Sequence, residues 1–286
     1  MEAGVPVVSV VIPTRNRADY LAVALASLAR QEFDQPYEVL VVDDGSSDGT
    51  ASVVRDAGVR RVVQDPARGL NAARNTGVRT GAAPLIAFLD DDVFVPPGWV
   101  RALAEGADRH VEADAFGGPI RARLEGPAPR ACGREDPPIT TLDLGPSDVE
   151  AEMVWGANMA IRRDAFDRIG PFDEAVAGHG DEEDWLQKLR AGGGRIVYLA
   201  GAGVDHRRAG DDARLRALAR AAYHRGRAAR VSDQRRGTAP GLLYEGRVLA
   251  GCVWHIGRYR CPQGAIMGAH SAGRLIQALA SASRPA

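Results

Sequence analysis

Short apolar runs that end in polar clusters recur along the amino-terminal part of the chain. Residues 7–12 (VVSVVI), 39–42 (VLVV) and 85–89 (LIAFL) are apolar almost throughout and have the length of strands. Such continuous runs are typical of strands buried on both faces of a parallel sheet. Helical spacing or helix signals follow in residues 19–28, 47–57, 69–81 and 99–107, with Asp19 expected as a helix N-cap. This order predicts an α/β fold with a mostly parallel sheet and right-handed crossovers.

The pattern changes after residue 114. One strand is expected at 116–124, and a long loop at 125–150, where Pro and Gly are frequent. A strand at 154–163 leads to a short helix at 164–169, and a hinge at 178–180 precedes a helix that ends at Gly192. Residues 195–199 and 202–205 are expected to be short strands. The remainder predicts a helical, Arg-rich extension over 207–286, which divides the chain after residue 206.

Carboxylates follow two of the apolar runs directly. Asp90, Asp91 and Asp92 follow residues 85–89, and Asp43 and Asp44 follow residues 39–42. Buried carboxylates need a partner or a proton, so the triplet is expected outside the core, at the carboxyl end of its strand. Ligands of open α/β sheets bind at that edge. Carboxylate oxygens suit a hard divalent cation that holds phosphate, although an isolated acidic triplet is more often a solvated turn.

Composition narrows the function classes only a little. The chain has 286 residues, with 36 Lys plus Arg against 37 Asp plus Glu, so the net charge predicts no nucleic-acid partner. The three cysteines lack a CxxC pair, which argues against a disulfide framework and a zinc site and favours a reducing compartment. We see no signal peptide and no run of 18 apolar residues, so the expected location is cytoplasmic.

The second expectation about location concerns the basic segment. Residues 207–236 contain ten Arg and three Asp. The favoured interpretation is a solvated helix that packs on the main domain. The alternative is a basic face toward anionic lipid, with peripheral contact at the inner face of the membrane, or toward donor phosphates.

Seven motifs occur in an order that resembles family 2 glycosyltransferases of the GT-A fold. Each motif is weak alone, and together they cover roughly residues 7–206. They are residues 10–17 (VVIPTRNR), 41–50 (VVDDGSSDGT), 73–77 (ARNTG), 88–92 (FLDDD), 156–163 (GANMAIRR), 169–174 (IGPFDE) and 181–184 (DEED). The resemblance implies a GT-A catalytic domain over 1–206, with a donor half to about residue 114 and an acceptor half from about residue 115.

The resemblance also implies a nucleotide-sugar donor, with UDP- and dTDP-sugars first. Asp90 and Asp92 match the DXD motif of the family, and His206 lies where many relatives have a further ligand for Mn²⁺ or Mg²⁺. Asp92 is the expected principal ligand. The residues expected to bind the donor are Pro13, Thr14, Arg15, Arg17, Asp44, Arg74, Asn75, Asp90 and Asp91.

Relatives of this kind invert the anomeric centre with a carboxylate general base. Relatives usually have Glu-Asp here, and in register with the following helix their Asp falls on Glu182, while Asp181 replaces the Glu. Glu182 is therefore the first candidate for the base and Asp181 the second. Trp155, Asn158 and Trp185 are candidates for the acceptor side, because aromatic faces pack on sugars.

The acceptor class stays open among carbohydrates, lipid-linked compounds and small molecules. Two other functions remain as alternatives. One is a nucleotide-sugar-binding protein without transfer activity. The other is a sugar nucleotidyltransferase, which would need a glycine-rich basic loop after the first strand, and residues 13–17 do not form one. A nicotinamide dehydrogenase is disfavoured because no GxGxxG follows that strand.

Overall fold

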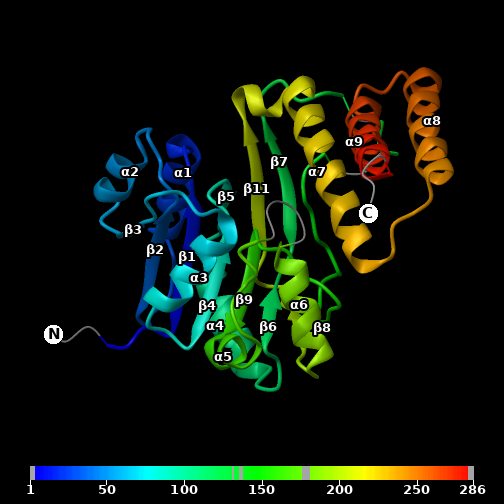
Figure 1. Ribbon diagram of the computed structural model, residues 1–286. Helices are drawn as coiled ribbons and strands as arrows, with labels where there is room; N and C mark the ends of the chain where they lie inside the picture. Colours follow the sequence, from blue (N-terminus) through cyan, green and yellow to red (C-terminus); the bar gives the residue numbers. More distant parts are fainter. Residues whose placement is uncertain (1–3, 131, 135–137, 176–180, 283–286) are drawn as a thin grey trace. The chain divides into compact units, whose positions relative to one another are not determined.

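The structure is a computed structural model that describes residues 4–130, 132–134, 138–175 and 181–282 (Figure 1). Their contacts divide the chain into two compact units. The first comprises described residues of 1–121, 141–177 and 181–206, and the second those of 122–140 and 207–286. The division predicted after residue 206 did not anticipate that residues 122–140 belong with the carboxyl-terminal helices. The predicted hinge at 178–180 lies outside the described residues.

Strand β1 (Val8–Thr14) shows why the first unit has continuous apolar strands. All seven of its residues are buried. Val10 and Ile12 pack in one hydrophobic cluster with α1 (Ala18–Leu28), α2 (Thr50–Asp56) and α4 (Trp99–Arg109). Val11, on the opposite face, packs with α3 (Leu70–Thr80), α5 (Arg163–Ile169) and α6 (Asp181–Ala191). Helices therefore cover both faces of the sheet, as the unbroken apolar runs predict.

The main sheet has eight strands in the order β3-β2-β1-β4-β9-β6-β10-β8. Strands β1, β2 (Tyr37–Asp43), β3 (Arg60–Val63) and β4 (Leu85–Leu89) pair in parallel, which confirms the predicted α/β class. Strand β9 (Asn158–Arg162) runs antiparallel to both β4 and β6 (Ala115–Gly117). β10 (Ile196–Tyr198) pairs in parallel with β6 and antiparallel with β8 (Val149–Glu150).

Some element predictions were wrong. The single strand expected at 116–124 is two strands in different sheets, because Gly117, Gly118 and Pro119 interrupt it. Strand β7 (Ile120–Glu125) joins a second sheet with the order β5-β11-β7, formed with β5 (Val93–Phe94) and β11 (Val204–Ala209). Asp19 lies inside the first turn of α1 and Arg17 holds the N-cap position; the Asp48 carboxylate accepts from Ala18 N.

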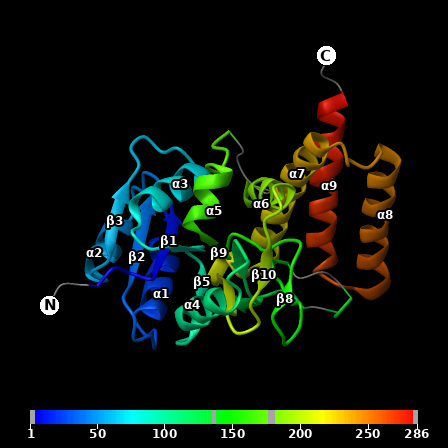
Figure 2. The same ribbon diagram turned by 90° about the horizontal axis from the view of Figure 1, so that it is seen from below.

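The carboxyl-terminal segment forms helices, as predicted. A short 3₁₀ helix (Gly210–Ala213) precedes α7 (Leu215–Arg236), α8 (Leu242–Tyr259) and α9 (Gly264–Ala282). Helix α9 lies between α7 and α8 (Figure 2). Glycines permit its close contact with α7, since a Cβ at Gly226 would overlap the carbonyl of His270 and one at Gly273 that of Tyr223.

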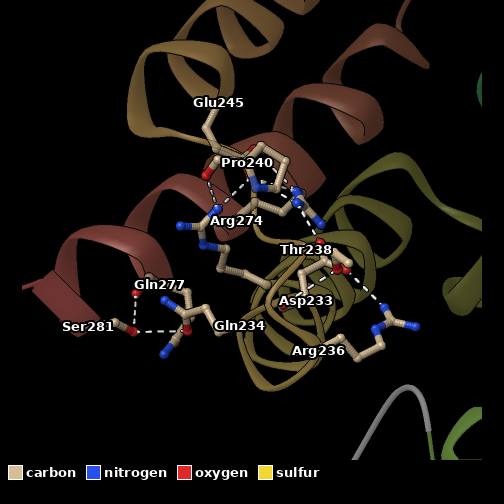
Figure 3. A network of polar contacts seen from close by, with 10 residues as sticks. Asp233, Gln234, Arg236, Thr238, Pro240, Glu245, Arg274, Gln277 and Ser281 are labelled. Atoms are coloured by element: carbon tan, nitrogen blue, oxygen red, sulfur yellow. Dashed lines mark hydrogen bonds and ion pairs between the residues drawn. The ribbon is translucent and has the colours of Figure 1, made fainter.

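An ion-pair network joins the three helices (Figure 3). The buried carboxylate of Glu245 accepts from Arg274 Nε at 3.0 Å and lies 3.3 Å from Arg230 Nη1, while Arg274 also reaches Asp233 at 2.8 Å. Buried charges need such partners, because a lone one would cost several kcal/mol of desolvation. Within the part of the chain that the structure describes, no helix combines the length and the apolar character that a membrane span requires.

Candidate functional site

The site is built at the carboxyl end of β4. Asp90, Asp91 and Asp92 follow the last residue of β4, and β5 begins directly after them. Strand β11 pairs with β5 so that His206 lies opposite Val93. This pairing brings His206 Nε2 to 3.3 Å from Asp92 Oδ1. One ligand atom each from Asp90, Asp92 and His206 lies within 4.8 Å of the others.

Arg17 and Thr14 contact the carboxylates of Asp91 and Asp92. The Arg17 guanidinium donates to Asp92 Oδ2 at 2.8 Å and lies 3.2 Å from Asp91 Oδ1. Thr14, the last residue of β1, donates its hydroxyl to Asp91 Oδ2 at 2.7 Å. Burial raises the pKa of Asp91 to about 7, and the Arg17 charge opposes this rise only in part. Asp91 therefore points into the protein, where it fixes Arg17 and the end of β1.

Asp90 is the member of the triplet that interacts with the opposite side of the site. Burial is the main cause that raises the pKa of Asp90, and repulsion from Asp92 is the second. Arg74 and His206 lower this pKa, and Glu182 raises it a little further. The pKa shift thus ties Asp90 electrostatically to residues of α3 and α6. A carboxylate in this position would be stabilised by a further positive charge.

Glu182 and Arg74 form the second part of the site. Glu182, near the start of α6, lies with Oε2 3.7 Å from Arg74 Nη1 and accepts from Gly156 N–H at 3.2 Å. Arg74 is 3% exposed and also donates to Asn71. A Cβ at Gly156 would overlap the Arg74 guanidinium, so only glycine permits this approach. In the β4–β9 pairing Leu89 is the partner of Asn158, so Gly156 lies two residues before β9, at the end of the sheet where the Asp triplet follows β4.

Asp44 lies at the end of β2 and organises the neighbouring loop. Its carboxylate is buried and accepts from Arg68 N at 2.6 Å and Gly69 N at 3.0 Å, which sets the start of α3. Its own amide donates to Thr14 O at 2.9 Å, so the ends of β1 and β2 are joined. Pro13 is buried within β1, whereas Arg15 beyond it is exposed to solvent. The predicted donor-binding residues of β1 and β2 therefore gather at one edge of the sheet.

Other predicted site residues have structural roles in this conformation. The amide of Asn75 bonds to the backbone of Phe172 in both directions, at 2.9 Å each. Asn158 is fully buried and bonds to Trp99, Pro119 and Ala202. Trp185 is 1% exposed and donates to Gly170 O at 2.8 Å. The structure does not bring these three side chains to the acidic cluster, and their binding roles stay predictions.

Trp155 differs from them because it is only partly buried and precedes Gly156, the contact of Glu182. Asp181 is the first residue of α6, and its side chain lies outside the described part of the chain. Sequence reasoning missed Gly156. A signal was available, since a glycine between Trp155 and a strand marks a close approach of some other group.

The donor set fits a divalent cation. Two carboxylate oxygens and an imidazole nitrogen at mutual separations within 4.8 Å are ligands that Mn²⁺ accepts. Burial and then repulsion from Asp92 raise the pKa of Asp90, and a bound cation would offset both effects. Tetrahedral sulfur ligands, which favour zinc, are absent from this cluster. Asp90, Asp92 and His206 are therefore the residues that would hold such an ion.

A mostly parallel sheet with helices on both faces and an acidic cluster at the strand ends defines an α/β protein of the class whose ligands bind at that edge of the sheet. The model of "Glycosyl transferase family 2" matches residues 9–170. The chain therefore belongs to glycosyl transferase family 2, as its motifs predict.

Curated relatives agree with this membership. A validoxylamine A glucosyltransferase of Streptomyces hygroscopicus is 33% identical over 210 residues, which cover 63% of this chain and 50% of the relative. A pre-mycofactocin glycosyltransferase of Mycobacterium tuberculosis is 31% identical over 264 residues, covering 87% of this chain and 53% of the relative. Glycosyltransferase AglE of Haloferax volcanii is 28% identical, with 69% and 66% covered. The chain spans about half to two thirds of the length of these relatives.

Solved structures show the same fold. A mannosyltransferase of Pyrobaculum calidifontis, in complex with GDP-Man and Mn²⁺, has a TM-score of 0.59 at 19% identity and covers 98% of this chain and 76% of that chain. GalNAc-T7 with UDP, GalNAc and Mn²⁺ has a TM-score of 0.57 at 16% identity, covering 78% and 48%. These similarities confirm the predicted GT-A architecture.

Proposed function

We propose that this chain is an inverting glycosyltransferase that moves a sugar from a UDP- or dTDP-sugar to an acceptor hydroxyl. The observation that carries the proposal is the placement of the Asp90, Asp92 and His206 cluster beside the Glu182–Arg74 pair. The charges of both pair members act on Asp90. This proximity supports the proposal that the acidic cluster and Glu182 act on the same bound donor.

In the proposed reaction the donor nucleotide binds at the ends of β1 and β2. Arg15 is exposed there and available to the nucleotide, while Asp44 and Thr14 fix the backbone around it. Asp90, Asp92 and His206 would hold Mn²⁺ or Mg²⁺. The chemistry that such an ion supplies is neutralisation of the negative charge on the diphosphate. The arrangement is consistent with two structural neighbours, one in complex with GDP-Man and Mn²⁺ and one with UDP, GalNAc and Mn²⁺.

Glu182 is the proposed general base. Its carboxylate takes the proton of the acceptor hydroxyl as that oxygen bonds to the anomeric carbon, and the bond from this carbon to the diphosphate oxygen breaks. The nucleoside diphosphate leaves from the opposite side, so the anomeric configuration inverts. Arg74, with Nη1 3.7 Å from Glu182 Oε2, and the Gly156 N–H group set the direction of this carboxylate.

Membrane contact through α7 remains a separate proposal with less support. Several of its arginines bond within the second unit, including Arg225 to Pro138 O, Arg227 to Gln277 and Arg230 to Glu245. These side chains are thereby committed to internal contacts. The acceptor class, carbohydrate, lipid-linked or small molecule, is set by surfaces that the described site does not specify.

Isothermal titration of the full chain with UDP-, dTDP- and GDP-sugars, with and without Mn²⁺, tests the proposal. We expect one donor to bind only with Mn²⁺ and to be hydrolysed slowly, with release of the nucleoside diphosphate. Metal-dependent binding with no turnover in any donor would instead identify a nucleotide-sugar-binding protein. Asp56→Asn is the control variant and should bind the donor as the wild type does, because this carboxylate is 72% exposed on α2 and lies 3.3 Å from the exposed Arg55.

A further inference from the structure

Three soft metal ligands meet in the second unit, apart from the acidic cluster of the first. One ligand atom each from Cys132, His255 and Cys261 lies within 4.8 Å of the others. Cys132 belongs to the segment after β7, His255 to the last turns of α8, and Cys261 to the turn before α9. The Cys132 Sγ atom lies 3.4 Å from His255 Nε2, across 123 residues of sequence.

The distance between Cys132 Sγ and His255 Nε2 matches an edge of a zinc coordination tetrahedron. With Zn–S about 2.3 Å and Zn–N about 2.0–2.1 Å, a tetrahedral ion holds two sulfurs about 3.8 Å apart and a sulfur and a nitrogen about 3.5 Å apart. The observed sulfur–nitrogen distance of 3.4 Å is within about 0.1 Å of that edge. The other two separations are at most 4.8 Å, so they reach the sulfur–sulfur edge with a shift of at most about 1.0 Å and the second sulfur–nitrogen edge with one of at most about 1.3 Å.

The local backbone is arranged to present Cys261 to His255. Helix α8 ends at Tyr259, and Arg260 adopts a left-handed conformation with φ of 49°, which is uncommon for a residue other than glycine. This turn reverses the chain within two residues of the helix, so Cys261 returns to the side of His255. Strain of this kind, held by surrounding contacts, is frequent at ligand sites.

Contacts around the cluster hold each ligand in place. The Gln263 side chain donates to Pro129 O at 3.4 Å, which ties the Cys132 segment to the turn that carries Cys261. A Cβ at Gly264 would lie 3.0 Å from the His255 ring, so α9 begins in direct contact with that ring. His255 and Cys261 are 9% and 2% exposed, whereas Cys132 is exposed. Two ligands are thus set in the unit and the third approaches from its surface.

We propose that Cys132, His255 and Cys261 bind a Zn²⁺ ion that fastens the Cys132 segment to the α8–α9 turn. Each thiol gives its proton to solvent and binds as thiolate, and His255 binds through Nε2 in its neutral form with the proton on Nδ1. Two thiolates and an imidazole select zinc over Mg²⁺ or Mn²⁺. The fourth position belongs to water or another small ligand, because the exposed side of Cys132 opens to solvent. The site is independent of the proposed transferase activity.

Metal analysis of the full chain is the first test. Protein purified without chelator, or stripped and reloaded with ZnCl₂, is expected to carry about one equivalent of zinc, released by a strong chelator. Cobalt substitution identifies the ligands, because only a sulfur site gives a thiolate-to-cobalt charge-transfer band. The acidic cluster of the first unit has no sulfur, so Asp92→Asn should keep the band.

Matched cysteine variants assign the site. Cys132→Ala and Cys261→Ala should both lose the band and most of the zinc, and Cys132 is at the surface, so its removal does not threaten folding. Cys252→Ala is the control, since its thiol bonds to Ser271 and takes no part in the cluster. In the Asp92→Asn background, which removes a ligand of the acidic cluster, zinc should raise the melting temperature of the chain and of Cys252→Ala, but not of Cys132→Ala.

Two results would overturn the proposal. One is the absence of the thiolate-to-cobalt band when the wild-type chain carries one equivalent of cobalt, or the persistence of that band in Cys132→Ala. The other is the loss of two titratable thiols under mild oxidation that added zinc does not prevent. That outcome would identify Cys132 and Cys261 as a redox-sensitive disulfide pair instead of a metal site.

Discussion

Glu182→Gln separates the proposed general base from the rest of the site. The glutamine has the same size, and its amide oxygen can still accept the Gly156 N–H bond that Glu182 Oε1 accepts at 3.2 Å. It loses the charge that faces Arg74 at 3.7 Å and the ability to take a proton. The substitution therefore changes the chemistry of one group and leaves its packing almost unchanged.

The structure indicates a large effect on rate and a small one on stability. General-base catalysis contributes about 10²–10⁴-fold, which corresponds to about 3–5 kcal/mol of barrier. The effect on stability has two opposing parts. The variant loses the attraction to Arg74, but it also loses the repulsion between Glu182 and Asp90, which is a minor contribution to the raised pKa of Asp90. We expect a net cost of about 1–2 kcal/mol, or a few degrees in Tm.

The assay is release of nucleoside diphosphate from the donor that binds best, with water as acceptor, together with donor affinity by calorimetry. Glu182→Gln should bind the donor within about threefold of the wild type and release product about 10²-fold or more slowly. Asp184→Asn is the control on the same helix, because its carboxylate is 42% exposed and its ion pair with Lys188 is worth about 0.3–0.5 kcal/mol. Wild-type turnover in Glu182→Gln would refute the assignment and direct the search to Asp181→Asn.

Three further predictions follow from particular contacts. Asp92→Asn should abolish Mn²⁺-dependent donor binding in calorimetry while the fold, measured by circular dichroism, is kept; unchanged binding would remove Asp92 from the metal site. Gly156→Ala should displace Arg74 and slow turnover about 10²-fold with little change in donor affinity, since misplacement by about 1 Å can cost that much. Gly77→Ala should lower the free energy of unfolding by about 1–3 kcal/mol, because its Cβ would overlap a β1 side chain. Gly251→Ala has open space around it and should stabilise α8 by up to about 1 kcal/mol, so equal Tm values for the two variants would contradict the packing argument.

The parallel half of the fold could be predicted because its strands carry their own signal. Strands β1, β2 and β4 lie between helices, so both faces are apolar and the runs are unbroken. Strand β3 was missed because it lies at the edge of the sheet. Val62 is half-buried, its other three residues are exposed, and two of these are arginines, so the strand has no apolar run. The apolar pattern also could not predict the direction of β9, because an antiparallel strand buried on both faces has the same pattern as a parallel one.

The site could be predicted only as far as its residues follow strands. The Asp triplet and His206 end or lie in strands, so the sequence could place them at a sheet edge. The contact of Gly156 with Arg74 depends on the pairing of β4 with β9, which no local pattern encodes. The same limit explains the cysteines. Their spacing argued against a zinc site, yet the fold brings Cys132 to His255 from 123 residues away.

The charges of the site bear on the order in which ligands bind. The carboxylates of Asp90, Asp91, Asp92 and Glu182 lie in one site, where the guanidiniums of Arg17 and Arg74 oppose their negative charge. Asp91, with its pKa of about 7, is partly protonated at neutral pH, which reduces the negative charge of the site without removing it. A nucleoside diphosphate brings more negative charge to the same place, so it would be repelled unless a cation came first or together with it. On this argument a divalent ion should bind the chain without the donor, whereas the donor should not bind measurably without the ion.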